Sequence, residues 1–348
     1  MSKLLKVVRI GILCAMSAGP LHAAHAQSDD YILGQGLNAG SFNIAGYATV
    51  EAHAKKGQDA GLLIDDLSLF VKGSVNRVIN PFLEVEMAEA DLWFEGSPPL
   101  KNIDPRVDIE RLYNDFILDD HVTFRVGKIL SPVGEWNSIH AGPLVWTTTR
   151  PLTSYRNYPE FVTGVSAIAE GLGAQELRVE TYWQPGSDLD GPDPSNVAYL
   201  FHNTYGLHAE LPLGLTDKIG LSLQGADVKG TREKQFLVGL NGRFTLDRLE
   251  IETEMTWTAL KHPLVVRKHK TEYAGYVQGA FAISDKLYLI GRGEFFRDRN
   301  FDRTSRNFLI GLNYRPKAPI SWKLEYVEQS GPNLGISSGP IASFNILF

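Results

Sequence analysis

Oppositely charged side chains gather around the longest expected loop of the chain, residues 132–160, which is 29 residues long. Five of them lie within this loop or just before it: Lys128, Glu135, Arg150, Arg156 and Glu160. Opposed charges set an ion preference where they face each other in a narrow passage. These residues therefore predict a charge-selecting constriction, provided that the rest of the chain builds a passage around them.

A histidine and two serines in the same loop suggest a different chemistry. His140 with Ser138 or Ser154 could act as the base and the nucleophile of an ester hydrolase. The sequence contains neither a nucleophile elbow nor a recognisable third member of such a triad. An enzyme is therefore the alternative prediction, and the principal prediction is that the protein is not one.

The elements that must position this loop are extended strands, because the body of the chain alternates between apolar and polar side chains. Residues 248–259 and 80–90 are the clearest examples. Polar side chains occupy every second position there: Glu84, Glu86, Glu250, Glu252, Glu254, Thr256 and Thr258. Successive side chains of a strand point to opposite faces. Each predicted strand thus has one apolar face and one polar face.

This alternation predicts sixteen strands, with a count of 14 or 18 as the alternative. The segment 107–118 alternates poorly and is the least regular of them. The predicted strands lie near residues 41–53, 62–75, 80–90, 107–118, 121–131, 161–170, 174–184, 198–211, 217–228, 235–246, 248–259, 271–283, 286–296, 306–315, 319–328 and 339–348.

The lengths of the expected connections alternate between short and long along the chain. The connections 119–120, 247 and 284–285 are very short, whereas 91–106 and 132–160 are long. A transmembrane β-barrel has tight turns at its periplasmic end and long loops at its external end. The pattern therefore predicts an all-β protein that is a transmembrane antiparallel β-barrel, with both termini on the periplasmic side.

Composition argues against two other classes of protein, helical membrane proteins and nucleic-acid-binding proteins. The mean hydropathy is −0.13, and beyond the first 20 residues no apolar run reaches the ~18 residues that one membrane-spanning helix needs. The formal net charge is −6, which disfavours binding to nucleic acid. A membrane barrel stays compatible with these values, because only half of each strand is apolar.

The N-terminus has the pattern of a cleaved export signal. Lys3, Lys6 and Arg9 precede a short apolar stretch, and Ala24-His25-Ala26 fits a cleavage site. We expect residues 1–26 to be a signal peptide and residues 27–348 to be the barrel domain. The only cysteine, Cys14, lies in the signal, and removing its three positive charges takes the net charge from −6 to −9.

A barrel of about sixteen strands encloses a water-filled lumen rather than a packed core. Such a tube predicts passive passage of small hydrophilic solutes or ions. A selective pore needs a narrowing, and the loop 132–160 is the third expected external loop and the longest. We expect this loop to fold into the lumen. The alternatives are that it caps the barrel outside or makes a subunit contact.

No cofactor or metal site is predicted. The chain contains no phosphate-binding loop, and the acidic loop 185–197 does not have the spacing of an EF-hand calcium site. That loop is expected to be solvated and external. The last strand ends on an aromatic residue, Phe348, with alternating residues before it. A terminal aromatic of this kind resembles the signal for insertion into a bacterial outer membrane, which is the expected location.

The segment that begins at residue 127 resembles the phosphate-selective porin type of outer-membrane channel and related porins. The matching residues are 127–137 (GKILSPVGEWN), Ile139-His140, Pro143 to Trp146 and Arg150-Pro151-Leu152. The resemblance implies a 16-stranded, usually trimeric diffusion channel with a loop folded into its lumen.

The best-known members of that family select anions through a ladder of Arg and Lys side chains, which has no counterpart that can be mapped onto this sequence. Anions such as phosphate are one candidate class of solute. The implied partners are small hydrophilic solutes or ions, outer-membrane lipid and lipopolysaccharide, and two further copies in a homotrimer. A lipase-like barrel enzyme and a closed structural or adhesive barrel are the alternative functions.

Overall fold

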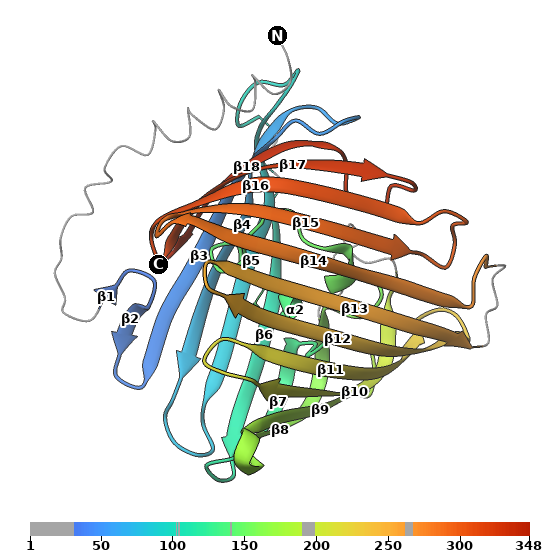
Figure 1. Cartoon of the computed structure of the whole chain (residues 1–348). Helices are drawn as coiled ribbons and strands as arrows, with labels where there is room; N and C mark the ends of the chain where they lie inside the picture. Colours follow the sequence, from blue (N-terminus) through green and yellow to red (C-terminus); the bar gives the residue numbers. More distant parts are fainter. Residues whose placement is uncertain (1–30, 102, 104, 140, 190–198, 262–266) are drawn as a thin grey trace.

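The computed structural model describes residues 31–101, 103, 105–139, 141–189, 199–261 and 267–348. The predicted signal peptide, including Cys14, and His140 therefore lie outside the described residues. Within these residues, sixteen long strands follow one another around a closed ring (Figure 1). They are β3 (Phe42–His53), β4 (Gly61–Gly73), β5 (Pro81–Phe94), β6 (Arg106–Ile117), β7 (Val122–Leu130), β8 (Phe161–Leu172), β9 (Leu177–Gln184), β10 (Phe201–Pro212), β11 (Lys218–Val228), β12 (Lys234–Leu246), β13 (Leu249–Lys261), β14 (Thr271–Ser284), β15 (Leu287–Arg297), β16 (Ser305–Lys317), β17 (Ile320–Ser330) and β18 (Gly339–Leu347).

Each of these strands pairs antiparallel with the next one along the chain, as β13 does with β14. The ring closes because β18 pairs with β3, for example Phe344 opposite Val50. Closure leaves no strand edge, so the backbone groups of every strand have hydrogen-bond partners, as a lipid environment demands. The predicted strand number and the antiparallel barrel are confirmed.

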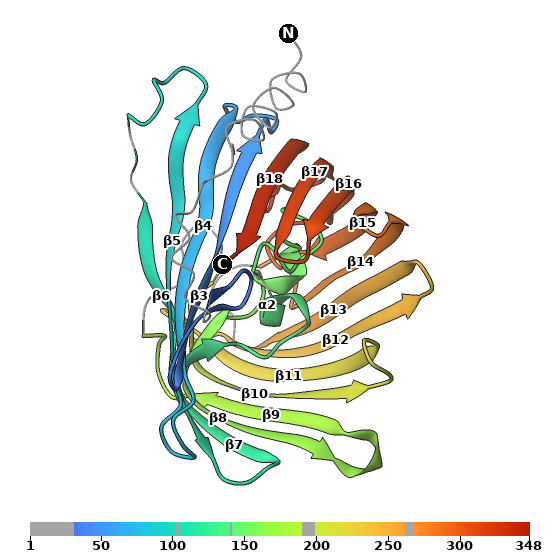
Figure 2. The same cartoon turned by 90° about the vertical axis from the view of Figure 1, so that its left-hand side faces the viewer.

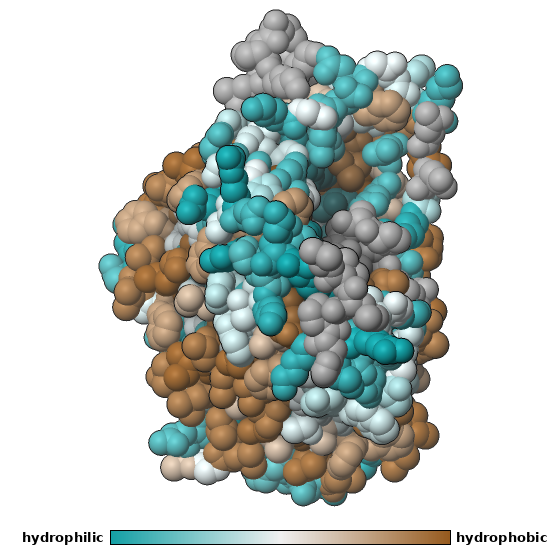
Figure 3. Space-filling model, turned by 90° about the vertical axis from the view of Figure 1, so that its right-hand side faces the viewer, coloured by the Kyte–Doolittle hydropathy of each residue, from teal (hydrophilic) through white to brown (hydrophobic). Residues whose placement is uncertain are grey.

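The alternation of side chains separates an apolar outer face from a polar inner one. On β13, Met255 and Trp257 are 53% and 40% exposed, whereas Glu252, Glu254 and Thr258 are buried. The same outward pattern recurs around the barrel and gives the brown apolar surface in Figure 3. Large exposed apolar side chains on other strands include Leu69, Phe236, Leu240, Val277, Phe308 and Ile310.

The connections alternate in length as predicted. Tight turns join β6 to β7, β12 to β13 and β14 to β15, whereas residues 131–160 join β7 to β8. This long segment contains the short helix α2 (Trp136–Ile139) and the 3-10 turn η1 (Leu152–Ser154). Within the described part of the chain, no helix is long and apolar enough to cross a bilayer.

A bulge explains why residues 107–118 alternate poorly. Glu84 is opposite Arg111 and Val85 is opposite Ile109, so Glu110 is an extra residue in β6. A bulge places two neighbouring side chains on the same face and breaks the period of two. Glu110 is buried and faces the interior together with Arg111.

The sequence interpretation missed a small N-terminal hairpin. Strands β1 (Tyr31–Ile32) and β2 (Gly36–Ala39) pair with each other, and β2 also pairs with the start of β3, where Leu37 is opposite Ile44. Strands of two and four residues are too short to give a recognisable alternation. The hairpin lies at the end of the barrel that carries the short turns (Figure 1).

Candidate functional site

Figure 2 shows α2, in the described part of the segment 131–160, surrounded by strands. The contacts of this segment are with side chains on the polar, inward faces. Leu152, Asn157 and Tyr158 are completely buried. The Asn157 amide donates hydrogen bonds to Thr256 and Thr258 of β13, at 2.9 and 3.3 Å.

Three inward glutamates of alternate strands bind backbone N–H groups of this segment. Glu254 of β13 accepts from Glu135 and Trp136 at 2.8 and 2.6 Å, at the start of α2. Glu294 of β15 accepts from Leu152, at the start of η1. Glu325 of β17 accepts from Thr148 and Thr149 at 3.0 and 2.7 Å.

Of these three carboxylates, hereafter the anchoring glutamates, Glu254 and Glu294 supply partners for N–H groups at the starts of short helical turns. Glu325 instead binds the irregular stretch before η1. A carboxylate is also favourable at the N-terminus of a helical turn, where the peptide dipoles point their positive ends. Inward glutamates of β13, β15 and β17 thus hold the segment in place.

Two glycines allow the segment to approach the wall closely. Gly134 has φ of +73°, and a Cβ atom there would overlap the carboxylate of Glu254. A Cβ atom at Gly142 would overlap the hydroxyl of Thr49 on β3. Any larger residue at Gly134 would push the segment away from its anchoring glutamate.

Arg150 joins the two ends of the segment. Its guanidinium forms an ion pair with Glu160 and donates to Asn137 Oδ1 at 2.7 Å and to Ser154 O at 3.0 Å. The Asn137 amide in turn donates to the carbonyls of Ser131 and Glu160, at 2.8 and 3.0 Å. Burial opposes the charge of Arg150, but the adjacent Glu160 carboxylate outweighs it and raises the pKa of Arg150.

Arg156 is tied to the external loops. It forms an ion pair with Asp298 of the β15–β16 loop, at 3.1 Å, and donates to the carbonyl of Leu334 in the β17–β18 loop, at 3.3 Å. Leu334 also packs in one buried apolar cluster with Leu152 and Phe296. Burial raises the pKa of Tyr155, beside this cluster, to about 12, so its phenol is neutral at physiological pH.

Lys128 and Glu135 are each paired within the barrel. Lys128 is 3% exposed, and its Nζ lies 3.1 Å from Asp188. Glu135 is buried against the opposite wall, where its carboxylate lies 2.8 Å from Lys218 Nζ and 3.4 Å from Arg243.

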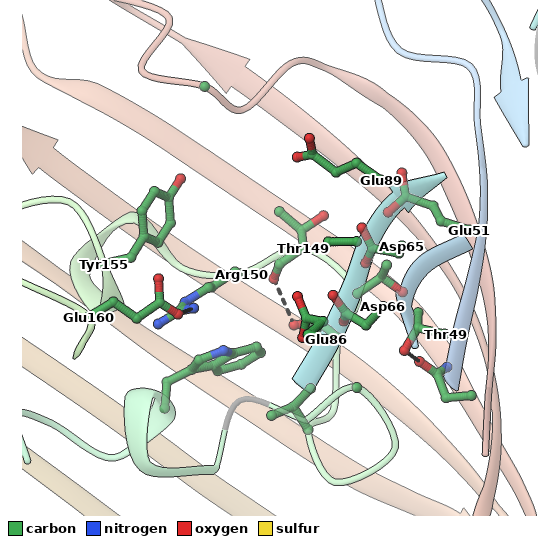
Figure 4. A pocket seen from close by; sticks show the side chains of 18 of the residues that line it. Thr49, Glu51, Asp65, Asp66, Glu86, Glu89, Thr149, Arg150, Tyr155 and Glu160 are labelled. Atoms are coloured by element: carbon green, nitrogen blue, oxygen red, sulfur yellow. Dashed lines mark hydrogen bonds and ion pairs between the residues drawn. The ribbon is translucent and has the colours of Figure 1, made fainter. Parts of the chain in front are cut away.

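A polar cavity of about 320 Å³ lies between this segment and the wall of β3–β6 (Figure 4). Lys128, Arg150 and Glu160 line it on one side. The facing wall carries acidic residues that the constriction prediction did not include: Glu51, Asp65, Asp66, Glu86, Glu89, Asp108 and Glu110.

The structure therefore brings together only part of the predicted set. Lys128, Arg150 and Glu160 meet at the cavity, whereas Glu135 and Arg156 bind other parts of the wall and the loops. The anchoring glutamates and the acidic wall were missing from the set. For Glu86 and Glu254 a signal was present in the alternating acidic positions, but the sequence does not tell which strand faces the segment.

Two further predicted residues have clear surroundings. Ser154, a candidate nucleophile of the enzyme alternative, is completely buried and donates to the carbonyl of Pro151 at 2.7 Å. Phe348 follows β18, and its backbone N–H and C=O both pair with Gly46 of β3 at 2.8 Å. The terminal residue thus belongs to the seam that closes the barrel.

Comparison with known proteins supports the fold. No protein-family model matches the chain, and no curated protein matches it in sequence. Among solved structures, the chain is similar to an OmpF–daunomycin complex of Salmonella typhi, with a TM-score of 0.65, 10% identity, and coverage of 88% of this chain and 97% of that one. The anion-selective porin of Comamonas acidovorans gives a TM-score of 0.63, 11% identity, and coverage of 88% and 99%.

A trimer form of OmpT, an outer membrane protein of Vibrio cholerae, is also similar, with a TM-score of 0.61 and 14% identity over 89% of this chain and 99% of that one. At these identities the similarity concerns the fold. The chain therefore has the closed 16-strand barrel of outer-membrane porins.

Proposed function

We propose that the protein is a porin: a passive aqueous channel for small hydrophilic solutes or ions in a bacterial outer membrane. The observation that carries this proposal is the closed ring with an apolar outer face and a polar inner face around a polar cavity. The outer face suits lipid, and the inner face suits water. The similar barrels of known porins support the same function.

The segment 131–160 is proposed as the constriction of this channel. Sixteen strands leave a lumen that side chains of the wall alone do not fill. The segment occupies part of that lumen and is held there by the anchoring glutamates. Among the predicted constriction residues, Lys128, Arg150 and Glu160 are the ones that line the cavity.

Three other features belong to the proposal. Residues 1–26 direct export, and Phe348 contributes to recognition by the insertion machinery. The protein works as a homotrimer in contact with lipid and lipopolysaccharide, in line with the trimer form of one similar barrel. Transport through such a channel needs no enzymatic activity.

Reconstitution of the purified protein in a planar bilayer tests the channel function. We expect stepwise conductance increments that do not depend on ATP, because the pore is passive. Membranes that stay silent, although gel analysis of the same bilayers or vesicles detects inserted barrel, would refute the channel and favour a closed structural barrel.

A pair of introduced cysteines tests the position of the segment. The hydroxyl oxygens of Thr148 and of Ser343, on the inward face of β18, lie 2.7 Å apart. In a Cys14→Ser background, we expect Thr148→Cys/Ser343→Cys to form a disulfide on mild oxidation, detected as loss of maleimide labelling. The matched control is Thr148→Cys/Ala342→Cys, because Ala342 points to the opposite face of the strand. Equal labelling of the two pairs would show that the segment lies elsewhere.

A further inference from the structure

The two sides of the cavity differ strongly in charge. The wall formed by β3–β6 and the residues beside them contributes seven carboxylates but only two cationic side chains, Lys55 and Arg106. Figure 4 shows Glu51, Asp65, Asp66 and Glu89 across the cavity from Arg150, Tyr155 and Glu160. We call the seven carboxylates of this side the acidic wall: Glu51, Asp65, Asp66, Glu86, Glu89, Asp108 and Glu110.

Both cations of that side are paired with its carboxylates. Lys55 pairs with Glu51 at 3.0 Å. Arg106 forms an ion pair with Asp108 and lies 3.8 Å from Glu89. Glu86 is bound by neutral donors, the hydroxyls of Ser68 and Tyr47, at 3.1 and 3.3 Å. On this side of the cavity, acidic side chains therefore outnumber cationic ones by seven to two.

The cations on the other side are already engaged. Arg150 is paired with Glu160, and Lys128 with Asp188. Lys323 of β17 donates to the backbone carbonyls of Gly142 and Thr147, at 2.6 and 3.1 Å. In total, eight carboxylates and five cationic side chains line the cavity. Arg150, which could have attracted anions, is largely neutralised by its own partner.

We infer that the channel prefers cations to anions and that the acidic wall sets this preference. The inference rests on the proposed channel function and identifies its solute class. The preference is attributed to the electrostatic field along the water-filled path and not to the binding of an ion at one site. Clefts lined by one sign of charge focus potentials of the order of kT or more, and ~1 kT would favour a monovalent cation over an anion by about sevenfold.

Reversal potentials in a KCl gradient at neutral pH test the inference. We expect a cation-to-anion permeability ratio above about three for the native chain, given potentials of this size. The isosteric variant Glu51→Gln/Glu89→Gln should lower that ratio at least about twofold, because it removes two charges from the acidic wall. If this variant does not insert, Glu89→Gln/Asp108→Asn replaces it with the same expectation.

The matched control is Asp120→Asn/Asp285→Asn, which removes two exposed charges from the short turns. It should leave the ratio unchanged. A native ratio at or below one, or equal ratios in the acidic-wall variant and the native chain, would overturn the inference while leaving the channel function intact. Absence of conductance would instead overturn the proposed function itself.

Discussion

Replacing the anchoring glutamates together, as Glu254→Ala/Glu294→Ala/Glu325→Ala, is expected to release the segment 131–160 and increase the single-channel conductance several-fold. All three side chains are less than 5% exposed, and each accepts at least one backbone N–H of the segment. A hydrogen bond to a charged group contributes about 1.5–3 kcal/mol. Loss of all three leaves buried N–H groups without acceptors and weakens the attachment of the segment along residues 135–152, although the contacts of Asn157 and Arg156 stay.

The measurement is the distribution of conductance steps and their noise in planar bilayers. Glu328→Ala is the matched control, because Glu328 lies on the exposed face of the same strand as Glu325. The triple glutamine variant keeps a carbonyl acceptor at each site and should give an intermediate conductance. A triple alanine variant with native steps and native noise would contradict the anchoring role.

The barrel itself was predictable because its physics is local. Alternation of side chains along each strand follows directly from strand geometry, and the residues that break it do so for identifiable reasons. Glu110 breaks it by forming a bulge, and the β1–β2 hairpin is too short to display it. The lengths of the loops could be predicted equally well, since each is the number of residues between two predicted strands.

The partners of the charged residues were not predictable, because they depend on closure of the ring. Glu325 binds Thr149 across 176 residues, and Arg156 binds Asp298 across 142. The sequence therefore predicted one ion-selecting group around the loop. In the structure, Lys128, Arg150 and Glu160 line the cavity, whereas Glu135 and Arg156 pair with other parts of the wall and the loops. Asp65 and Asp66 carried no local signal, since neither the loop nor the family resemblance includes them.

Replacing Arg150 distinguishes a structural role from an electrostatic one and is expected to have the second large effect. Arg150→Ala should raise conductance and noise, because it leaves Glu160 without its cation and Asn137 without a donor. Removing one partner of a largely buried ion pair costs about 3–5 kcal/mol. The segment would lose the contact that holds its ends together.

The informative comparison is with Arg150→Lys. Lysine keeps the positive charge but lacks the planar fork that reaches Glu160, Asn137 and Ser154 at once. If Arg150 acts by organising the segment, Arg150→Lys should resemble Arg150→Ala in conductance and noise. If it acts as a charge in the pore, Arg150→Lys should resemble the native channel, and only Arg150→Ala should change the reversal potential.

Arg306→Ala, on the exposed face of β16, controls for loss of an arginine. Because Arg150 is paired with Glu160, we expect the first result, which would leave ion preference to the acidic wall.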